Sequence, residues 1–436
     1  MAKESAAKRT GTKKAAKEAG AQKSAENRKS TQKVSKVTVT QKSTSIRKSK
    51  QKAIKTTAAK KPVKKSKNQK KVTKRVLNEL ILKGKQQGYL TFDEINETLP
   101  EDLLSSDQID ETLMVERRKV VGSPVHCAEY IPAPLVGELN IAKRYIVQSV
   151  RGIKTFLHDQ MIKASLTPGF IIKRDVFDQT LVDEACRKGA HILLSTKAVS
   201  RNENEVIIKS KSELPAKVNT NIIIGTDGPF STVGKWINSV NKNLITAVQV
   251  RVPLSCELDF TEVYFDNEIF GGYGWLFPKG AKANIGLGIK KKDHKPPPLG
   301  KLLNQFISQR SCEGKIEKKP SGLISGWIPA QTLKKTVHEN VLLAGDAAGH
   351  THPITGAGIF PAITCGHMAG KWAARAIEAK NLNLLSHYEE EYRDLFGDSM
   401  DRALGRRQLM EKKWAQLDDT LKYCWVAFKE YYARTS

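Results

Sequence analysis

Between residues 72 and 114 the apolar positions recur with the spacing of short helices. A helical period links Val76, Leu77, Leu80 and Ile81, and Gly84 is a residue type that commonly ends a helix. Thr91 and Ser105 each begin a capping box, in which a hydroxyl and an acid or amide three residues later can satisfy first-turn amides. The pattern therefore predicts a small bundle of three short helices over residues 72–114.

From residue 115 onward the pattern changes to apolar strands that alternate with helices. Residues 244–290 are rich in strand-forming residues, and from about Gly366 the pattern is helical. This order is typical of an α/β protein with an inserted antiparallel sheet. We expect an α/β body over residues 115–390, with the inserted sheet at 244–290, and C-terminal helices over residues 391–436.

The first 71 residues follow neither period. They consist mostly of Lys, Ala, Ser, Thr and Gln without any aromatic residue, so they offer too little apolar surface to offset the chain entropy lost on folding. Residues 1–75 hold 26 of the 73 Lys and Arg residues but only 3 of the 45 Asp and Glu residues, so most of the +28 net charge lies there. We expect a disordered basic tail that binds nucleic acid non-specifically through its phosphates. A merely solubilising tail is the alternative.

Cysteine usage and hydropathy bear on the cellular compartment. The six cysteines are scattered without a C-x-x-C pair, and neither a secretory signal nor an apolar run of transmembrane length occurs. These features favour a cytoplasmic protein without disulfides or a structural metal. Residues 414–432 are aromatic and amphipathic, so this segment could pack on the body or contact the inner membrane surface peripherally. Packing is the favoured interpretation.

The strongest chemical motif lies at residues 340–358. An apolar strand would deliver Gly345 and Asp346 to a ligand, with the carboxylate accepting a hydrogen bond from a ligand hydroxyl. Small residues allow a ligand close to the backbone, and a helix that begins near Gly356 would direct its positive end at negative charge.

Three weaker signals precede that motif. Asp227 and Gly228 lie in a glycine turn between a buried strand and a helix, Arg174 precedes another helix, and Glu116 follows a strand. An acid at the end of a strand is the usual acceptor for ribose hydroxyls in dinucleotide folds. Each feature alone could be an ordinary turn or surface acid, but their order and spacing together favour a cofactor site.

These stretches resemble the FAD-binding reductases and hydroxylases of the glutathione-reductase-like superfamily. Two further stretches resemble the geranylgeranyl reductases within it. They are Pro124–Glu129, with Cys127, and Gly272–Gly280 followed by Asn284–Gly288, with Tyr273 and Trp275. The resemblance covers about residues 115–410. It implies a Rossmann-like FAD domain with an inserted substrate sheet, and FAD-dependent reduction of C=C bonds in a geranylgeranyl lipid.

The resemblance also implies roles for individual residues. Contacts to FAD fall on Glu116, Arg117, Arg174, Asp227, Gly228, Gly345, Asp346, Pro353, Gly356 and Gly358. The catalytic positions are Cys127, beside the flavin and not a nucleophile, and Tyr273 and Trp275, which line an apolar tunnel. Arg174 or Lys279 would meet a phosphate head group, and NADPH or ferredoxin would supply electrons. His350 and His352 could shuttle protons, although a structural role is favoured.

The helical segment resembles a different family. Residues 82–96, 99–104 and 106–113 are similar to region 1.1 of primary bacterial sigma factors, and nine acids without Lys or Arg lie between Tyr89 and Glu116. The resemblance implies contact with RNA polymerase through a module that mimics the charge of DNA. Nothing after residue 114 resembles the other sigma regions, so a working sigma factor is not expected.

One element of the reductase pattern is missing. Family members begin with a strand, a G-x-G-x-x-G turn and a helix that binds the FAD pyrophosphate, and no G-x-G-x-x-G occurs in this sequence. We therefore expect an incomplete FAD domain without its central parallel strand, and severely weakened or lost FAD binding. Three interpretations stay open: a reductase with impaired activity, a chimeric reading frame without function as a unit, and a transcription-associated binding protein.

Overall fold

The computed structural model describes residues 112–138, 143–211, 214–291 and 299–433. The predicted basic tail and almost all of the predicted acidic helical bundle lie outside the described residues. The description below therefore concerns the α/β body and the C-terminal helices.

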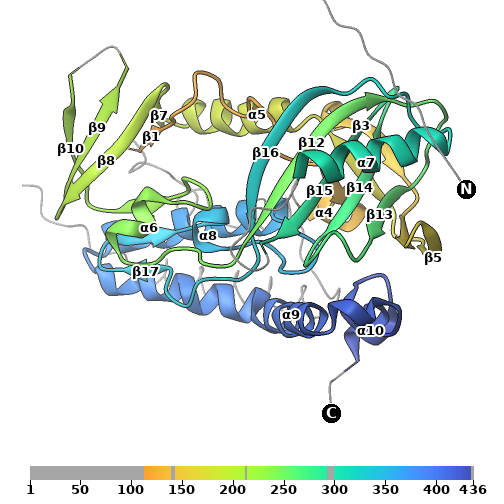
Figure 1. Cartoon of the computed structure of the whole chain (residues 1–436). Helices are drawn as coiled ribbons and strands as arrows, with labels where there is room; N and C mark the ends of the chain where they lie inside the picture. The colour runs from red at the N-terminus through yellow and green to blue at the C-terminus, as the bar shows by residue number, and fades with distance from the viewer. Residues whose placement is uncertain (1–111, 139–142, 212–213, 292–298, 434–436) are drawn as a thin grey trace, which may run out of the picture. The chain divides into compact units, whose positions relative to one another are not determined.

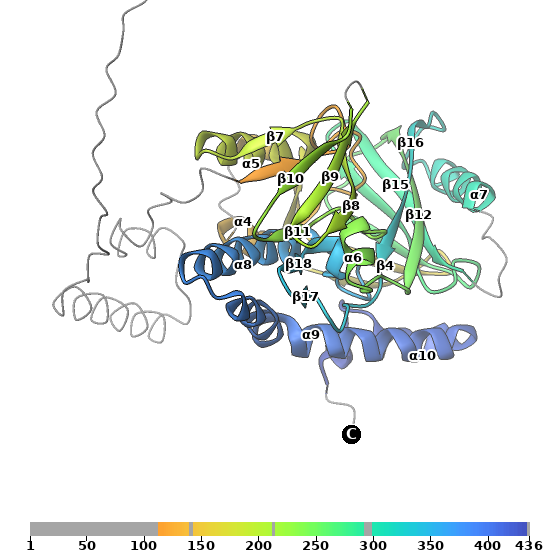
Figure 2. The ribbon, with the colours of Figure 1, turned by 90° about the vertical axis from the view of Figure 1, so that its left-hand side faces the viewer.

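Short parallel strands form two separate sheets. In one, β1 (Leu113–Val115) pairs in parallel with β7 (His191–Leu193). In the other, β11 (Ile223–Gly225) pairs in parallel with β18 (Val341–Leu343), and β17 (Val337–His338) pairs antiparallel with β18. Figure 2 shows β11 and β18 next to helix α8 (Ile359–Glu378), which packs on Leu342.

The predicted burial of the strand at residues 222–225 is only partly correct. Gly225 is buried, but Ile224 is 38% exposed. The physical reason is the position of β11 at the edge of its sheet, with no strand paired on its outer side among the described residues. An edge strand leaves both backbone groups and side chains uncovered.

A seven-stranded mixed sheet forms the largest part of the body (Figure 1). Its order is β16 (Ser321–Pro329), β12 (Leu244–Pro253), β15 (Lys282–Lys290), β14 (Tyr273–Lys279), β13 (Thr261–Phe265), β4 (Ile153–Leu157) and β5 (Gln160–Ser165). All pairs are antiparallel except β13 with β4. Strands β12 to β15 lie within residues 244–290, the region where antiparallel strands are expected from the sequence.

Helix α7 (Leu299–Cys312) covers one face of this sheet (Figure 1). Its apolar residues Leu303, Phe306 and Ile307 are buried against Leu276 and Leu287 of the strands. Burial of these side chains stabilises the helix on the sheet by the hydrophobic effect.

Smaller elements connect these layers. Strands β2 (Tyr130–Pro132), β6 (Gly169–Ile172) and β3 (Ile146–Val150) form one antiparallel sheet, and β8 (Thr196–Asn202), β9 (Glu205–Ser210) and β10 (Ala216–Asn219) form another. The helices are α4 (Ala133–Glu138), α5 (Arg174–Arg187) and α6 (Thr232–Trp236), and the 3-10 turns are η1 (Lys143–Tyr145), η2 (Gly345–Ala348), η3 (Leu382–Leu385), η4 (Trp414–Gln416) and η5 (Lys429–Tyr432).

The C-terminal region is helical, as expected. Helix α8 is followed by α9 (Ser386–Lys412) and α10 (Leu417–Cys424), which run along the lower side of the body in Figure 1. The aromatic segment after α9 packs on the body, because Trp414, Trp425 and Tyr431 are all buried. The ring of Trp425 meets that of Tyr273 with centroids 5.4 Å apart. Within the described residues, none of the helices combines the length and apolar character needed to cross a bilayer.

Candidate active site

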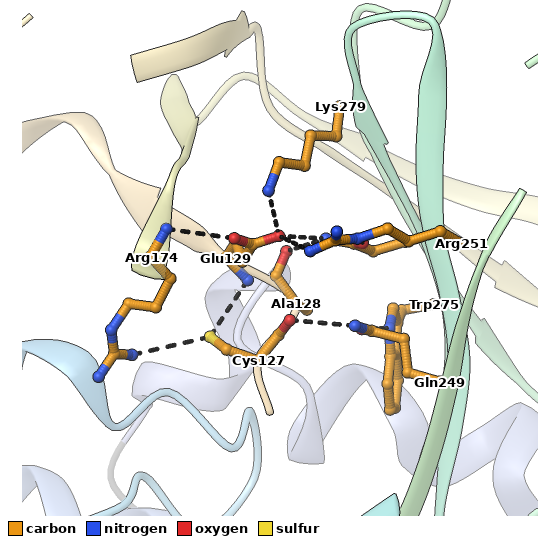
Figure 3. A network of polar contacts seen from close by, with 9 residues as sticks. Cys127, Ala128, Glu129, Arg174, Gln249, Arg251, Trp275 and Lys279 are labelled. Atoms are coloured by element: carbon orange, nitrogen blue, oxygen red, sulfur yellow. Dashed lines mark hydrogen bonds and ion pairs between the residues drawn. The ribbon is translucent and has the colours of Figure 1, made fainter. Parts of the chain in front are cut away.

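The loop that carries Cys127 lies between Arg174, the first residue of α5, and Gln249 of strand β12 in the large sheet (Figure 3). The backbone N–H of Glu129 donates to Sγ of Cys127 at 3.2 Å, and Nη1 of Arg174 lies 3.9 Å from the same sulfur. From the sheet side, Nε2 of Gln249 donates to the carbonyl oxygen of Cys127 at 3.1 Å. Burial raises the pKa of the Cys127 thiol, and the Arg174 guanidinium only partly opposes this effect. The thiol is therefore held mainly in its protonated form.

Glu129 anchors this loop to three other segments. Its side chain has no exposed surface, and its carboxylate accepts from Nζ of Lys279 at 2.5 Å and from Nδ2 of Asn284 at 3.0 Å. The backbone N–H of Arg174 donates to its other oxygen at 3.2 Å, and Arg251 completes an ion pair at 3.5 Å. A fully buried carboxylate is stable only when it is paired and hydrogen-bonded, as here.

The aromatic strand β14 supplies the next part of the site. Nε1 of Trp275 donates to Oε1 of Gln249 at 2.9 Å, which fixes the indole ring on the sheet. The hydroxyl of Tyr273 donates to the carbonyl oxygen of Thr355, and burial raises the pKa of Tyr273. Tyr273 thus contacts the loop at residues 353–356, and Trp275 is held by Gln249.

An apolar pocket lies where strand and loop meet. It is lined by Ile245, Gly272, Tyr273, Trp275, Gly288, Ile328, Pro329, Pro353, Ile354 and Gly356. Four residues predicted from the sequence, Tyr273, Trp275, Pro353 and Gly356, are therefore brought together here. The pocket holds about 30 Å³, which is room for roughly one water molecule.

Strand β18 leads directly into residues 344–358, which carry Asp346 and are called the Asp346 loop. The Asp346 carboxylate accepts from the Thr351 hydroxyl at 3.1 Å, and burial raises its pKa, with Thr351 and Arg174 opposing. Gly358 lies beside this carboxylate and precedes α8, so the helix begins within a few residues of the predicted position. Gly345 has φ +61° and Gly356 φ +67°, a region that glycine adopts without steric cost.

Of the two histidines in this loop, His350 is buried and His352 is half-buried. Burial lowers the pKa of His350 to about 3 and that of His352 to about 4. The His350 ring stacks on Tyr392 at 4.2 Å, while Nδ1 of His352 accepts from the Thr355 amide at 3.2 Å. These surroundings support the structural interpretation over proton shuttling.

Eight of the ten predicted cofactor residues do not line the pocket: besides Arg174, Gly345, Asp346 and Gly358, they are the four described next. The Glu116 carboxylate accepts from the backbone N–H of Arg118 at 2.7 Å, and Arg117 is exposed. Asp227 accepts from the amide of Thr232, the first residue of α6, at 2.6 Å, and the N-cap of that helix is Ser231. The neighbouring Gly228 has φ +85° and open space around it. Asn241 links the two loops, because its Nδ2 donates to carbonyl oxygens of both Pro229 and Asp346.

Sequence reasoning missed Glu129, Gln249 and Asn284 as parts of the site. A signal did exist, since Gln249 and Asn284 each interrupt an apolar strand. A polar side chain inside a buried strand requires a partner, which predicts a buried hydrogen-bond network. The partners themselves lie more than a hundred residues away along the chain.

Comparison with known proteins gives two family matches. Residues 243–323 match the model of the geranylgeranyl reductase catalytic domain, and residues 71–115 match that of sigma-70 factor region 1.1. A digeranylgeranylglycerophospholipid reductase of Methanosarcina mazei is 31% identical over 319 residues, which cover 67% of this chain and 77% of that protein. A second such reductase, from Methanococcoides burtonii, is 32% identical with the same coverage.

Solved structures agree with these matches. A geranylgeranyl bacteriochlorophyll reductase-like protein of Thermoplasma acidophilum superposes with a TM-score of 0.61 at 28% identity, covering 71% of this chain and 83% of that one. A flavin-dependent brominase superposes with a TM-score of 0.55 at 13% identity, covering 70% and 85%. The second likeness concerns the fold alone.

Proposed function

The chain belongs to the geranylgeranyl reductase family, and from this premise we propose that it uses FAD to reduce C=C bonds of an isoprenoid lipid. The observation that carries the proposal is the meeting of two predicted segments at one pocket. Tyr273 and Trp275 from the aromatic strand line it together with Pro353 and Gly356 from the Asp346 loop. Relatives named for reduction of digeranylgeranylglycerophospholipid make such a lipid the proposed substrate.

The residues around the Asp346 loop fit the flavin end of FAD. Gly345 and Gly356 leave the backbone bare, and the partly buried Asp346 carboxylate can accept from a hydroxyl of the ribityl chain. The N-terminus of the long helix α8 follows directly at Ile359 and favours negative charge beside it. When bound, reduced FAD would supply the hydride for the double bond.

Within the part of the chain that the structure describes, the pyrophosphate end has no comparable cradle. Neither the sequence nor the described residues contain the glycine-rich turn, and the parallel strands form two separate pieces with free edges at β1 and β11. This division supports the prediction of an incomplete FAD domain that lacks a central strand. The cofactor would then be contacted only from the two separate sheet pieces, by Glu116 and Arg117 on one side and Asp227 and Gly228 on the other.

The chain's own side chains would orient the substrate and limit access of water. The pocket walls at Ile245, Ile328 and Ile354 are apolar, so they suit a hydrocarbon chain. Because the pocket has room for about one water, a lipid chain enters only if lining side chains shift. Arg174 and Lys279, proposed for a phosphate head group, already pair with Asp178 and Glu129.

The comparisons do not favour the other two interpretations of the whole chain. The match at residues 71–115 nevertheless supports RNA polymerase as a proposed partner of that segment. Non-specific nucleic-acid binding by the basic tail and peripheral membrane contact stay predictions, as do the domain boundaries and NADPH or ferredoxin as reductant. A pull-down of polymerase by full-length chain, but not by residues 115–436, would support the polymerase contact; equal capture by both would reject it.

The decisive experiment measures flavin and product on the full-length protein. We expect purified chain to retain flavin in a substoichiometric amount, and added FAD to raise it toward one equivalent. With a chemical reductant, digeranylgeranylglycerophospholipid should gain two hydrogens per reduced bond by mass spectrometry. Absence of both flavin binding and product at saturating FAD would overturn the proposal.

A further inference from the structure

Glu129 lies where three strands of the large sheet meet helix α5 (Figure 3). Its carboxylate meets Lys279 at the end of β14, Asn284 in β15 and Arg251 in β12. On the opposite side it accepts the backbone N–H of Arg174, the first residue of α5. One side chain therefore joins the large sheet to the helix that faces Cys127.

The backbone of Glu129 is also constrained. Its φ is +68°, a left-handed conformation that residues with a Cβ rarely adopt. In this conformation its N–H donates to Sγ of Cys127, while its carbonyl oxygen accepts from the Ile172 amide at 2.9 Å. Such a conformation persists where surrounding contacts determine it, and the buried carboxylate provides these contacts.

The side chains of Cys127 and Arg174 depend on this arrangement. Arg174 reaches the Cys127 sulfur at 3.9 Å and the Asp178 carboxylate at 2.6 Å, and its charge also opposes the rise in the pKa of Asp346. Cys127 is held from the sheet by Gln249 and from its own loop by the Glu129 amide. Movement of Glu129 would displace both groups together.

We propose that Glu129 is a positioning residue that fixes the Cys127 thiol and the Arg174 guanidinium beside the Asp346 loop. Its relevance to catalysis rests on the proposed function, but its effect on the thiol does not. Glu129 acts through Cys127 and Arg174, because its carboxylate is fully buried among protein groups.

The test is the pH profile of Cys127 alkylation by iodoacetamide, read by peptide mass spectrometry. The exposed Cys256 and Cys312 are first replaced by serine, and all samples are compared at equal flavin content. The groups that act electrostatically on the thiol are Arg174, Glu129 and Asp178. Burial and the Glu129 charge both raise its pKa, so wild-type Cys127 should react slowly at neutral pH.

Two variants at this site should act in opposite directions. Glu129→Gln removes the negative charge and leaves Lys279 and Arg251 unbalanced, so alkylation at neutral pH should accelerate by roughly threefold to tenfold. Lys279→Met leaves Glu129 with less compensation, so alkylation should slow. If Glu129→Gln does not fold, the Lys279→Met profile decides alone: slower alkylation supports the proposal and an unchanged profile overturns it.

The matched control is a second buried carboxylate in the same sheet. Glu262 pairs with Lys315 at 2.9 Å and does not contact Cys127. We expect Glu262→Gln to lower the Tm comparably without changing the Cys127 profile. Equal profiles for Glu129→Gln and Glu262→Gln would show that Glu129 only stabilises the fold.

Activity gives a separate readout. If both proposals hold, Glu129→Gln should lower kcat more than it raises KM, because groups that orient the site act after binding. A changed thiol profile without any wild-type reductase activity would refute the proposed function alone. An unchanged thiol profile in an active enzyme would refute only the role of Glu129.

Discussion

Trp275 and Gln249 are joined by a hydrogen bond of 2.9 Å from the indole Nε1 to the amide Oε1. The same amide donates through Nε2 to the carbonyl oxygen of Cys127 at 3.1 Å. Gln249 therefore uses both ends of its side chain to connect the aromatic strand to the cysteine loop. A side-chain amide can accept through its oxygen and donate through its nitrogen in this way.

Replacement of Gln249 by methionine should weaken both the fold and the site. The change keeps the length of the side chain but leaves the buried Trp275 N–H without an acceptor, which costs about 1–3 kcal/mol. We expect urea denaturation to show a loss of this size and reductase kcat/KM to fall on the order of tenfold. Gln160→Met, at an exposed position of β5, is the control and should change neither quantity. An equal loss in both variants would contradict this explanation.

Gly286 is required for the position of the Trp275 ring. A Cβ at residue 286 would lie 2.4 Å from the indole Cζ2 and 2.4 Å from the carbonyl oxygen of Val248, closer than atoms can approach. Backbone cannot yield as a flexible side chain does, so Gly286→Ala should destabilise by at least about 1–3 kcal/mol. Tryptophan fluorescence should report the displaced ring.

Gly366 provides the opposite case for the same substitution. It lies on the exposed side of α8, and an added Cβ would meet no atom within 4 Å. Alanine inside a helix is preferred over glycine by about 0.5–1 kcal/mol. Gly366→Ala should therefore raise the free energy of unfolding, and a loss similar to that of Gly286→Ala would show that the steric argument is wrong.

Local patterns predicted those parts of the site that are continuous in sequence. The Asp346 loop and the helix expected near Gly356 are confirmed by η2 and by α8, which begins at Ile359. Strands β12 to β15 also fall within residues 244–290, where strands are expected. In these segments the apolar period and the glycines specify the local structure directly.

Contacts between distant segments were not predictable in the same way. Glu129 and Asn284 are separated by 155 residues, and nothing in the local pattern of either states which partner it meets. The exposure of Ile224 shows the converse limit, since its apolar strand looks buried in sequence but lies at a sheet edge. Pairing between strands is a non-local property that periodicity alone does not contain.

His350 should make the protein sensitive to acid. Its pKa falls from 6.5 to about 3 on burial, so the unfolded chain binds a proton more readily than the folded one below pH 6.5. Stability therefore decreases as the pH falls from 6.5 toward 3, by up to about 1.4 kcal/mol per pH unit from this residue.

Replacement of His350 by phenylalanine should remove this contribution. Neither ring nitrogen of His350 has a hydrogen-bond partner among the described residues, and phenylalanine can preserve the stacking on Tyr392. Denaturation midpoints from pH 7 to pH 5 should show a shallower decline than for wild type. His191→Phe, at an exposed position, is the control. An unchanged slope in His350→Phe would contradict a neutral buried imidazole.

Asp346 should show a conflict between stability and cofactor binding. Burial raises its pKa, so the folded protein holds the carboxyl proton more tightly than the unfolded chain, and stability falls as the pH rises through that window. At neutral pH the buried negative charge of Asp346 still lowers the stability. Asp346→Asn removes this charge, and the amide oxygen of the asparagine can still accept from the Thr351 hydroxyl. We expect the flavin-free variant to have a higher Tm than wild type at neutral pH, with a smaller difference in acid.

Flavin retention of Asp346→Asn after gel filtration should fall nevertheless, because an uncharged amide accepts more weakly from a ligand hydroxyl than a carboxylate does. Asp266→Asn, at a carboxylate on the surface of the large sheet, should leave flavin retention unchanged. Flavin retention equal to that of wild type in Asp346→Asn would show that Asp346 does not bind the cofactor.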